Sequence, residues 1–338
     1  MIDSPIVPTV DFEREGIQHG YLRLPWSRDD SAWGNLMIPI TVVSNGPGPT
    51  ALVTGGSHGD EYEGPIALAD FARKVEVDEV TGRIILVPFM NYPAFRAGTR
   101  LSPIDTFNLN RTFPGRPDGS VTEKIADYIQ RALLPMADLV LDFHSGGKTL
   151  DFLPFAACHV LENKAQEARC REARDAFCAP YSMTMLEIDA VGMLDTAAEA
   201  LGKVFVTTEI GGGGTATART LAIARRGLAN ILKHAGILAG PIDHRPSVFL
   251  DMPGPECFSF SQSEGFIEPA VDLGAQVRKG DLLLSVHPIE RLGGEPQEYR
   301  AGLDGILAAR HYPGLVGLGD CLAVVASVEP DISVDEQR

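Results

Sequence analysis

The sequence is poor in positive charge and in cysteine, and it contains no long hydrophobic run. Its 29 lysine and arginine residues are outnumbered by 45 aspartate and glutamate residues, which gives a formal net charge of −16. Nucleic acids and anionic membrane surfaces are bound through clustered positive charge, so we expect neither as a partner. No segment approaches the roughly 18 consecutive apolar residues of a membrane-spanning helix, so we also expect no membrane insertion.

The cysteines are odd in number and include no C-x-x-C pair; they are Cys158, Cys170, Cys178, Cys257 and Cys321. This usage is typical of free thiols in a reducing compartment rather than of a disulfide framework. The opening residues MIDSPIVPTVDFERE show no basic region followed by an apolar stretch, so no secretory signal is expected. The sequence therefore predicts a cytoplasmic protein in which no cysteine binds a metal.

What the chain does contain is the composition and patterning of a globular α/β protein. Of its 338 residues, 44% are hydrophobic and 22% charged, which suits one large domain with a smaller module. Between about residues 20 and 238, short apolar runs alternate with helical stretches, a pattern typical of a doubly wound sheet. The expected strands are 38–44, 50–55, 83–89, 138–143 and 203–209, and the expected helices are 64–74, 120–134, 163–177 and 215–235.

A second module follows a proline-rich stretch at 240–256. Residues 265–286 and 304–325 form a weak repeat, each with a V-x-x-G-D sequence or a close variant before a hydrophobic strand. Two such halves resemble the barrel-sandwich of biotinyl and lipoyl carriers, but the segment between them, VHPIERLGGEPQEYR, has no lysine to carry a cofactor. We therefore expect a structural or site-lining β module at 250–330, after a catalytic domain at 1–240.

Polar side chains follow the predicted strands. His58 and Glu61 in TGGSHGDEYEGP come just after one strand, and His144 in LVLDFHSGG ends another. The i, i+3 spacing places an imidazole and a carboxylate on one face of a turn, and catalytic zinc is often bound by two histidines and a glutamate. Asn91 and Glu209 also lie at strand ends, where open α/β sheets bind their ligands. The pattern predicts a zinc-dependent hydrolase, although hydrogen-bonded structural histidines in a glycine-rich loop would give the same residues.

Glu209 ends the otherwise β-branched run VFVTTE, where a carboxylate is costly to bury unless it has a role. A zinc hydrolase needs a general base, and Glu209 suits that task; the alternative is an exposed strand end. The following glycines 211–214 lack the Lys-Ser/Thr of a phosphate loop, which favours close backbone approach or mobility instead. Asp142, two residues before His144, is expected to point with it, either as its partner or in a structural role.

The segment 91–115 is longer and more polar than ordinary connections, and loops of this length are usually functional. It carries Arg96, Arg100 and Arg111, whose guanidinium groups could bind a carboxylate or polarise a carbonyl. Solvated charge or ion pairing is the alternative, and we favour it for Arg96. Six further histidines show no metal-binding spacing and are expected on the surface or in packing: His19, His159, His234, His244, His287 and His311.

Five motifs occur in one order: G-G-x-H-G-D-E-x-E-G-P, N-x-P-A-F-x-x-x-x-R, N-L-N-R-x-F-P-G, D-x-H-S-G and T-x-E-x-G. Together they resemble the succinylglutamate desuccinylase/aspartoacylase family, a branch of the zinc carboxypeptidase superfamily. The resemblance covers about residues 50–235, and the C-terminal β module fits it too. It implies a zinc-carboxypeptidase-like mixed sheet flanked by helices, and hydrolysis of the amide bond of a small N-acyl amino acid.

The resemblance also implies roles for individual residues. The ligands of one zinc ion per chain would be His58, Glu61 and His144. Glu209 would be the catalytic base, and Arg100 would polarise the scissile carbonyl. Asn110 and Arg111 would bind a substrate carboxylate. A non-catalytic zinc-binding protein would need neither Glu209 nor Arg100, so their presence favours an enzyme.

Within the family, GIQHGYLRLPWSRDDSAWGNLMIPI and SHGDEYEGP most resemble the deacetylases of ectoine degradation, which release acetate from N-α-acetyl-L-2,4-diaminobutyrate. The ammonium of that substrate needs an acidic partner, and the stretch 185–200 offers Glu187, Asp189 and Asp195. It contains no lysine or arginine for the second carboxylate of N-acetylaspartate or N-succinylglutamate. The alternatives are a deacylase of another N-acyl amino acid and a peptide-cleaving carboxypeptidase, and the sequence leaves homo-oligomerisation open.

Overall fold

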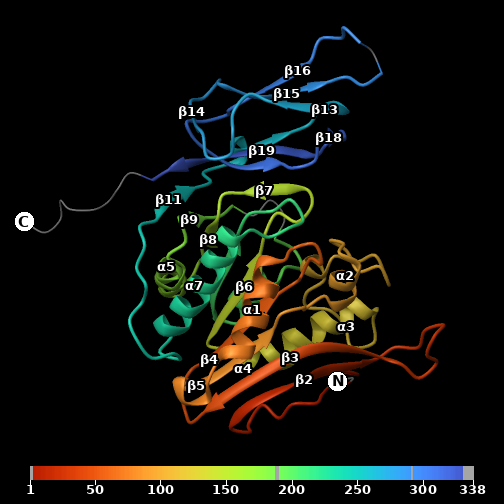
Figure 1. The fold of residues 1–338 in the computed structure, drawn as a ribbon, viewed down its shortest axis with the longest axis vertical. Helices are drawn as coiled ribbons and strands as arrows, with labels where there is room; N and C mark the ends of the chain where they lie inside the picture. The colour runs from red at the N-terminus through yellow and green to blue at the C-terminus, as the bar shows by residue number, and fades with distance from the viewer. Residues whose placement is uncertain (1–2, 187–189, 291, 330–338) are drawn as a thin grey trace, which may run out of the picture.

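The computed structural model describes residues 3–186, 190–290 and 292–329 (Figure 1). Its α-helices are α1 (Glu63–Lys74), α2 (Tyr92–Ala97), α3 (Val121–Tyr128), α4 (Leu134–Met136), α5 (Lys164–Phe177), α6 (Leu194–Ala200) and α7 (Ala218–His234). Short helical turns are η1 (Val77–Glu79), η2 (Leu109–Arg111), η4 (Pro255–Cys257) and the π-helical η3 (Ile129–Leu133). Within these residues, no helix is long and apolar enough to cross a membrane.

The strands of the first two thirds of the chain are β1 (Val7–Pro8), β2 (Gly16–Pro25), β3 (Asn35–Asn45), β4 (Thr50–Gly55), β5 (Gly82–Val87), β6 (Leu139–His144), β7 (Leu150–Phe152), β8 (Phe155–Cys158), β9 (Tyr181–Thr184) and β10 (Val204–Glu209). Those of the last third are β11 (Val248–Asp251), β12 (Phe258–Phe260), β13 (Gly265–Pro269), β14 (Gln276–Val277), β15 (Leu282–His287), β16 (Gln297–Arg300), β17 (Gly305–His311), β18 (Leu315–Val316) and β19 (Cys321–Val328).

The central sheet is mixed, as the family resemblance implies. Its strands follow the order β3-β5-β4-β6-β10-β8-β9-β11. The neighbours β5, β4, β6 and β10 run parallel, whereas β3 and β8 pair antiparallel to their neighbours β5 and β10. The carboxyl ends of β4, β6 and β10 therefore lie at one edge, which is where the sequence places the polar side chains.

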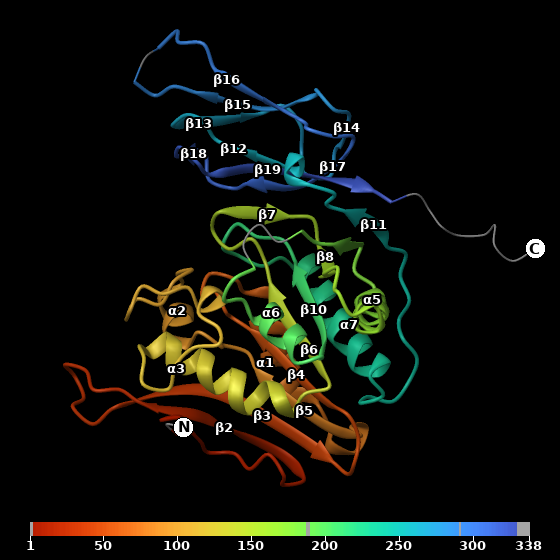
Figure 2. The same ribbon diagram turned by 180° about the vertical axis from the view of Figure 1, so that it is seen from behind.

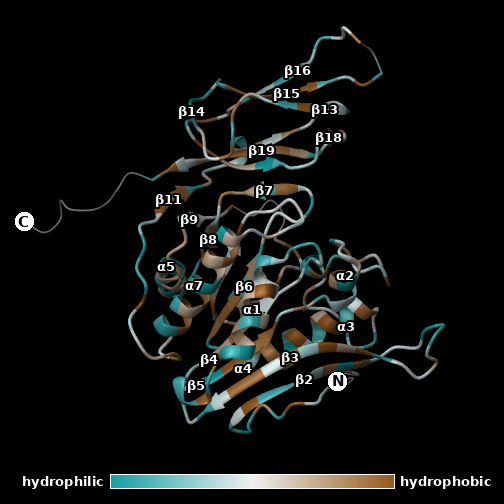
Figure 3. Ribbon diagram, viewed as in Figure 1, coloured by the Kyte–Doolittle hydropathy of each residue, from teal (hydrophilic) through white to brown (hydrophobic). Residues whose placement is uncertain are grey.

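Both faces of this sheet are buried, because successive strand residues point to opposite sides. Leu52 and Val140 belong to one hydrophobic cluster, with residues of α3 and α6, while Val53 and Leu141 belong to the other, with residues of α1, α5 and α7. Figures 1 and 2 show these helices on the two sides of the sheet. In Figure 3 the central strands are largely hydrophobic, whereas hydrophilic and hydrophobic residues alternate around the helices.

Two predicted helices differ in detail from those observed. The expected helix 120–134 is divided into α3, the π-helical η3 and α4, and Pro135 in α4 has no N–H with which to continue an α-helical ladder. The observed start of this segment agrees with the predicted one, since Ser120 caps α3 and forms a reciprocal capping box with Glu123. The expected helix 215–235 begins at Ala218, because the Thr217 side chain accepts a hydrogen bond from the Thr220 backbone N–H and caps it.

The C-terminal strands form a second sheet, which is antiparallel, in the order β16-β15-β13-β18; it packs over β14, β17 and β19 (Figure 1, top). The predicted repeat is visible as two equivalent turns: the Arg278 N–H donates to Asp281 Oδ2, and the Gly317 N–H donates to Asp320 Oδ2. The large sheet nevertheless runs on between the two parts, because β11 pairs with both β9 and β19. A division into domains at 1–240 and 250–330 therefore stays a prediction.

Candidate active site

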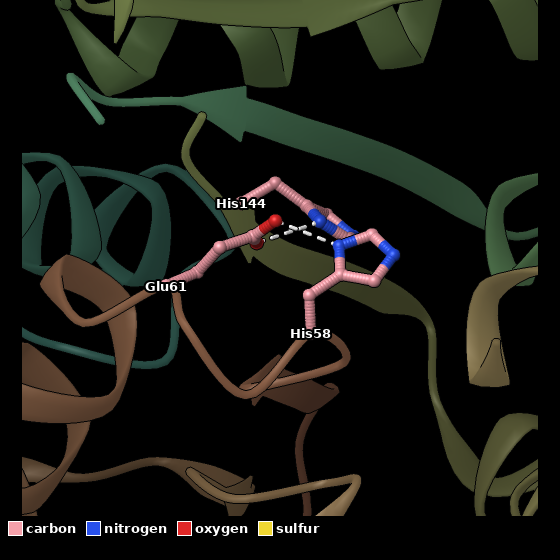
Figure 4. Close-up of side chains that lie close together, drawn as sticks. All are labelled: His58, Glu61 and His144. Atoms are coloured by element: carbon pink, nitrogen blue, oxygen red, sulfur yellow. Dashed lines mark hydrogen bonds and ion pairs between the residues drawn. The ribbon is translucent and has the colours of Figure 1, made fainter. Parts of the chain in front are cut away.

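Three buried side chains meet at the carboxyl edge of the sheet (Figure 4). His58 and Glu61 lie on the turn between β4 and α1, and His144 is the last residue of β6. Glu61 Oε1 lies 2.7 Å from His58 Nδ1, and Glu61 Oε2 lies 3.0 Å from His144 Nδ1. One ligand atom from each residue lies within 4.8 Å of the others, and no second group of this kind occurs among residues 3–186, 190–290 and 292–329.

The backbone explains why residues 86 positions apart in sequence converge. β4 and β6 are parallel neighbours with Gly55 opposite Phe143, so the chain leaves both strands at the same level. The turn that carries His58 also packs tightly against α2: a Cβ atom at Gly59 would lie 2.0 Å from the carbonyl of Ala94. Only glycine fits there, which accounts for the glycine that follows His58.

The outer nitrogen of each histidine has an oxygen partner. His144 Nε2 lies 2.9 Å from Asp142 Oδ2, and Asp142 Oδ1 in turn accepts a 2.6 Å hydrogen bond from the Thr54 hydroxyl. His58 Nε2 lies 3.1 Å from Asn108 Oδ1. An oxygen acceptor at Nε2 holds the proton there and leaves the Nδ1 lone pair for a metal ion. The contact with His144 therefore favours the partner role for Asp142. The contact with His58 gives Asn108 a corresponding role, which the motif N-L-N-R did not reveal.

The electrostatics of the cluster suit a cation. Burial lowers the pKa of the His58 imidazole, and the positive charge of Arg100 lowers it further. Burial alone would raise the pKa of Glu61, but the two histidines outweigh it and hold that pKa below its usual range. Burial opposes charge on His144 as well, yet the carboxylates of Asp142 and Glu61 raise its pKa well above the usual value. The Glu61 carboxylate thus needs positive charge beside it, and two imidazole nitrogens with one carboxylate form a donor set that fits a divalent metal.

Glu209 and Arg100 flank this cluster. Glu209 ends β10 directly beside His144 in the parallel register and lines the same cavity of about 280 Å³. The half-exposed Arg100 reaches the cluster from the long loop, with Nη1 3.3 Å from His58 Nδ1 and 3.7 Å from Glu61 Oε1. A carboxyl group and a guanidinium group therefore line the same cavity as the His58, Glu61 and His144 cluster.

Three further residues that the sequence predicted for the site also line the cavity: Asn110, Arg111 and Asp195. Asn110 Oδ1 accepts a 2.9 Å hydrogen bond from the Leu194 N–H, and Arg111 Nη1 donates to the Asn110 carbonyl at 2.6 Å. Asp195 lies in α6. Arg96 is not among the lining residues and donates to the Tyr92 hydroxyl at 3.2 Å, in line with the role favoured for it. The other two acidic candidates, Glu187 and Asp189, lie outside the described residues.

The C-terminal strands contact the cavity wall indirectly, because β17 pairs with β7, whose residues line the cavity. Leu150 and Phe152 of β7 line the cavity, and β7 pairs antiparallel with β17 (Figure 2). An ion pair of 3.3 Å between Arg310 Nη2 and Asp151 Oδ2 joins the same two strands. Strand β17 of the module predicted as structural or site-lining thus supports β7, which forms one wall of the cavity.

Fold and site together define a class of protein. A His-Glu-His cluster at the carboxyl edge of a mixed α/β sheet, with a carboxyl and a guanidinium group beside it, is the arrangement of a metal-dependent hydrolase. A family model described as the succinylglutamate desuccinylase/aspartoacylase catalytic domain matches residues 47–235, and the chain belongs to this family.

Three relatives extend this result. The chain is 54% identical over 327 residues, 96% of each chain, to the N-alpha-acetyl-L-2,4-diaminobutyric acid deacetylase of Halomonas elongata. It is 60% identical to the product-bound ectoine utilization protein EutE (DoeB) of Ruegeria pomeroyi, with a TM-score of 0.96 over 97% of this chain and 100% of that one. It is 59% identical to a succinylglutamate desuccinylase of Silicibacter sp. TM1040, with a TM-score of 0.95 and the same coverage. The chain is therefore a hydrolytic enzyme.

Proposed function

We propose that the protein is a zinc-dependent deacetylase of N-α-acetyl-L-2,4-diaminobutyrate. The observation that carries the proposal is one cavity lined by the His58, Glu61 and His144 cluster together with Glu209, Arg100, Arg111 and Asp195. The names of the Halomonas and Ruegeria relatives support the substrate. His58, Glu61 and His144 would hold the ion, which when bound would acidify a water molecule and polarise the acyl carbonyl.

The residues of the chain divide the remaining chemistry among them. Glu209 accepts a proton from the attacking water and later delivers it to the departing amine. The Arg100 guanidinium donates hydrogen bonds to the acyl oxygen as negative charge develops there. Asn110 and Arg111 bind the α-carboxylate, which fixes the amide bond in position for attack. Asp142 and Asn108 keep the two histidines oriented.

The two arginines are expected to affect different kinetic constants. Arg100→Ala removes a donor to developing charge and should lower kcat by about 10²-fold. Arg111→Ala removes a charge-assisted hydrogen bond to the bound substrate and should raise KM by about 10- to 100-fold. Steady-state kinetics on both variants would measure the separate effects on kcat and KM, with Arg96→Ala as the matched control from the same segment. Equal effects of the two substitutions on kcat alone would refute the assigned roles.

Asp195 provides the sharpest test of the substrate. We assign it to the substrate ammonium because it is buried, lines the cavity and lies on the element whose first N–H is bonded to Asn110. Asp195→Asn should lower kcat/KM for the acetyl-diaminobutyrate by about tenfold or more, since a charge-assisted hydrogen bond is lost. Acetate release from N-acetyl-L-2-aminobutyrate, which lacks the ammonium, should change little.

The control for this measurement is Glu199→Gln, on the same helix but paired with His159 Nδ1 at 2.9 Å and absent from the cavity lining. It should leave the ratio between the two substrates unchanged. If Asp195→Asn lowers both substrates equally, the residue does not bind the ammonium, and the argument for this amino acid loses its structural support.

A further inference from the structure

A second pocket adjoins the catalytic cavity and takes no part in the chemistry described above. Its volume is about 410 Å³, and residues of β7, β8, β9, β12, β17 and β19 line it. Its walls include the aromatic rings of Phe155, Phe258 and Phe260 and the thioethers of Met183 and Met252. Small-molecule sites typically have this size and this apolar character.

The pocket borders the catalytic cavity. Four residues line both spaces: Arg111, Leu150, Phe152 and Met185. Arg111 is the one charged residue among the described residues that line the second pocket. His58, Glu61, His144, Arg100 and Glu209 line the catalytic cavity alone. Among the residues with a proposed catalytic or binding role, Arg111 alone lines both spaces, so the second pocket adjoins the catalytic cavity at the residue assigned to the substrate carboxylate.

This junction determines which part of a substrate could enter the second pocket. A molecule with its carboxylate at Arg111 and its acyl carbonyl at the metal-binding end has its Cα between the two, so its side chain can extend past Leu150, Phe152 and Met185. An ammonium would be costly to place among those apolar walls, whereas an alkyl or aryl group is favoured there. The side chain of diaminobutyrate thus belongs near Asp195, and the apolar pocket is left for a different side chain.

We propose that this pocket binds the apolar side chain of a second class of substrates, N-acetyl amino acids with unbranched aliphatic or aromatic side chains. The inference rests on the proposed deacetylase function. It assigns a side-chain subsite to Phe258, Phe260, Met252 and Cys321, residues that do not reach the catalytic cavity.

A homologous series of substrates tests the proposal. We expect kcat/KM to rise from N-acetyl-L-alanine through N-acetyl-L-norvaline to N-acetyl-L-norleucine, because each buried methylene contributes about threefold to fourfold. The norleucine derivative, with three more methylenes than the alanine derivative, should be better by about tenfold or more. A flat or falling series overturns the proposal.

Two phenylalanines provide a matched pair of variants. Phe260 is 45% exposed and lines the pocket, whereas Phe266 is 46% exposed, lies in β13 and is absent from the lining. Phe260→Ala should lower the norleucine-to-alanine ratio of kcat/KM by about threefold, and Phe266→Ala should leave it unchanged. Cys321 in β19 pairs with Phe260 of β12 and also lines the pocket, so Cys321→Phe should fill it and lower the same ratio. Equal ratios in all four proteins would overturn the assignment.

The failure of this inference and the failure of the proposed function are distinguishable. Turnover of N-α-acetyl-L-2,4-diaminobutyrate with a flat series rejects the subsite alone. If no N-acetyl amino acid is hydrolysed, the proposed function fails, and calorimetry of N-acetyl-L-norleucine against N-acetyl-L-alanine then decides the subsite. Tighter binding of the norleucine derivative that is lost in Phe260→Ala supports it, and equal affinities reject it.

Discussion

Replacing Glu209 by glutamine is expected to lower kcat by about 10²- to 10⁴-fold while the fold and the bound metal are retained. The amide has nearly the same shape as the carboxyl group, but it cannot accept a proton from water. The backbone of residue 209 pairs with His144 of β6 and with Phe155 of β8, and neither pairing depends on the side chain. Because His58, Glu61 and His144, the proposed metal ligands, lie on other elements, their geometry should survive the substitution.

The measurement is kcat with N-α-acetyl-L-2,4-diaminobutyrate, alongside the metal content and the circular dichroism of the same sample. Glu298→Gln, in β16 of the C-terminal sheet, is the control for the loss of one negative charge. A Glu209→Gln protein with full metal content and near-normal kcat would show that another group takes the proton.

Removal of the metal should abolish activity, and one equivalent of zinc per chain should restore it. The prediction rests on the burial of all three proposed ligands and on the absence, among the described residues, of a second group that could hold an ion. The metal should also stabilise the fold, because a ligand that binds only the native state adds about 2.7 kcal/mol when present at 100 times its Kd. Chelation should therefore lower Tm as well as activity.

Two histidine variants separate this effect from nonspecific damage. His144→Ala should lose the bound metal, whereas His287→Ala should keep it, since His287 pairs with Glu268 in the C-terminal module. Metal content is measured per chain on the purified proteins. Full activity of a chelated protein that contains no detectable metal would contradict the proposed chemistry.

Many of the strands could be predicted from the sequence, because the pattern of apolar residues that marks a strand is local. The run TALVTG was expected as a strand at 50–55 and forms β4 over the same residues, buried on both faces. Since β4 and β6 run parallel side by side, placing polar residues at their ends was enough to bring His58 and His144 together. The existence of the cluster could therefore be predicted without knowledge of its distances.

Other features depend on contacts that no local pattern encodes. The reversed direction of β8 between β10 and β9 follows from tertiary packing, and so does the contact of Asn108 with His58. The walls of the second pocket come from β8, β9, β12, β17 and β19, which are separated by up to about half the chain. Only the folded structure assembles such a surface, so the second pocket could not be predicted from local sequence patterns.

A competition assay tests the central claim most directly. The zinc-loaded enzyme is given equal concentrations of N-α-acetyl-L-2,4-diaminobutyrate, N-acetylaspartate and N-succinylglutamate at neutral pH, and the three free amino acids are quantified at early times. The ratios of their rates equal the ratios of kcat/KM. We expect diaminobutyrate to be released at least about tenfold faster than either dicarboxylic amino acid, a difference of roughly 1.4 kcal/mol in transition-state binding. Faster release of aspartate or glutamate would contradict the proposed substrate and leave only the hydrolase assignment.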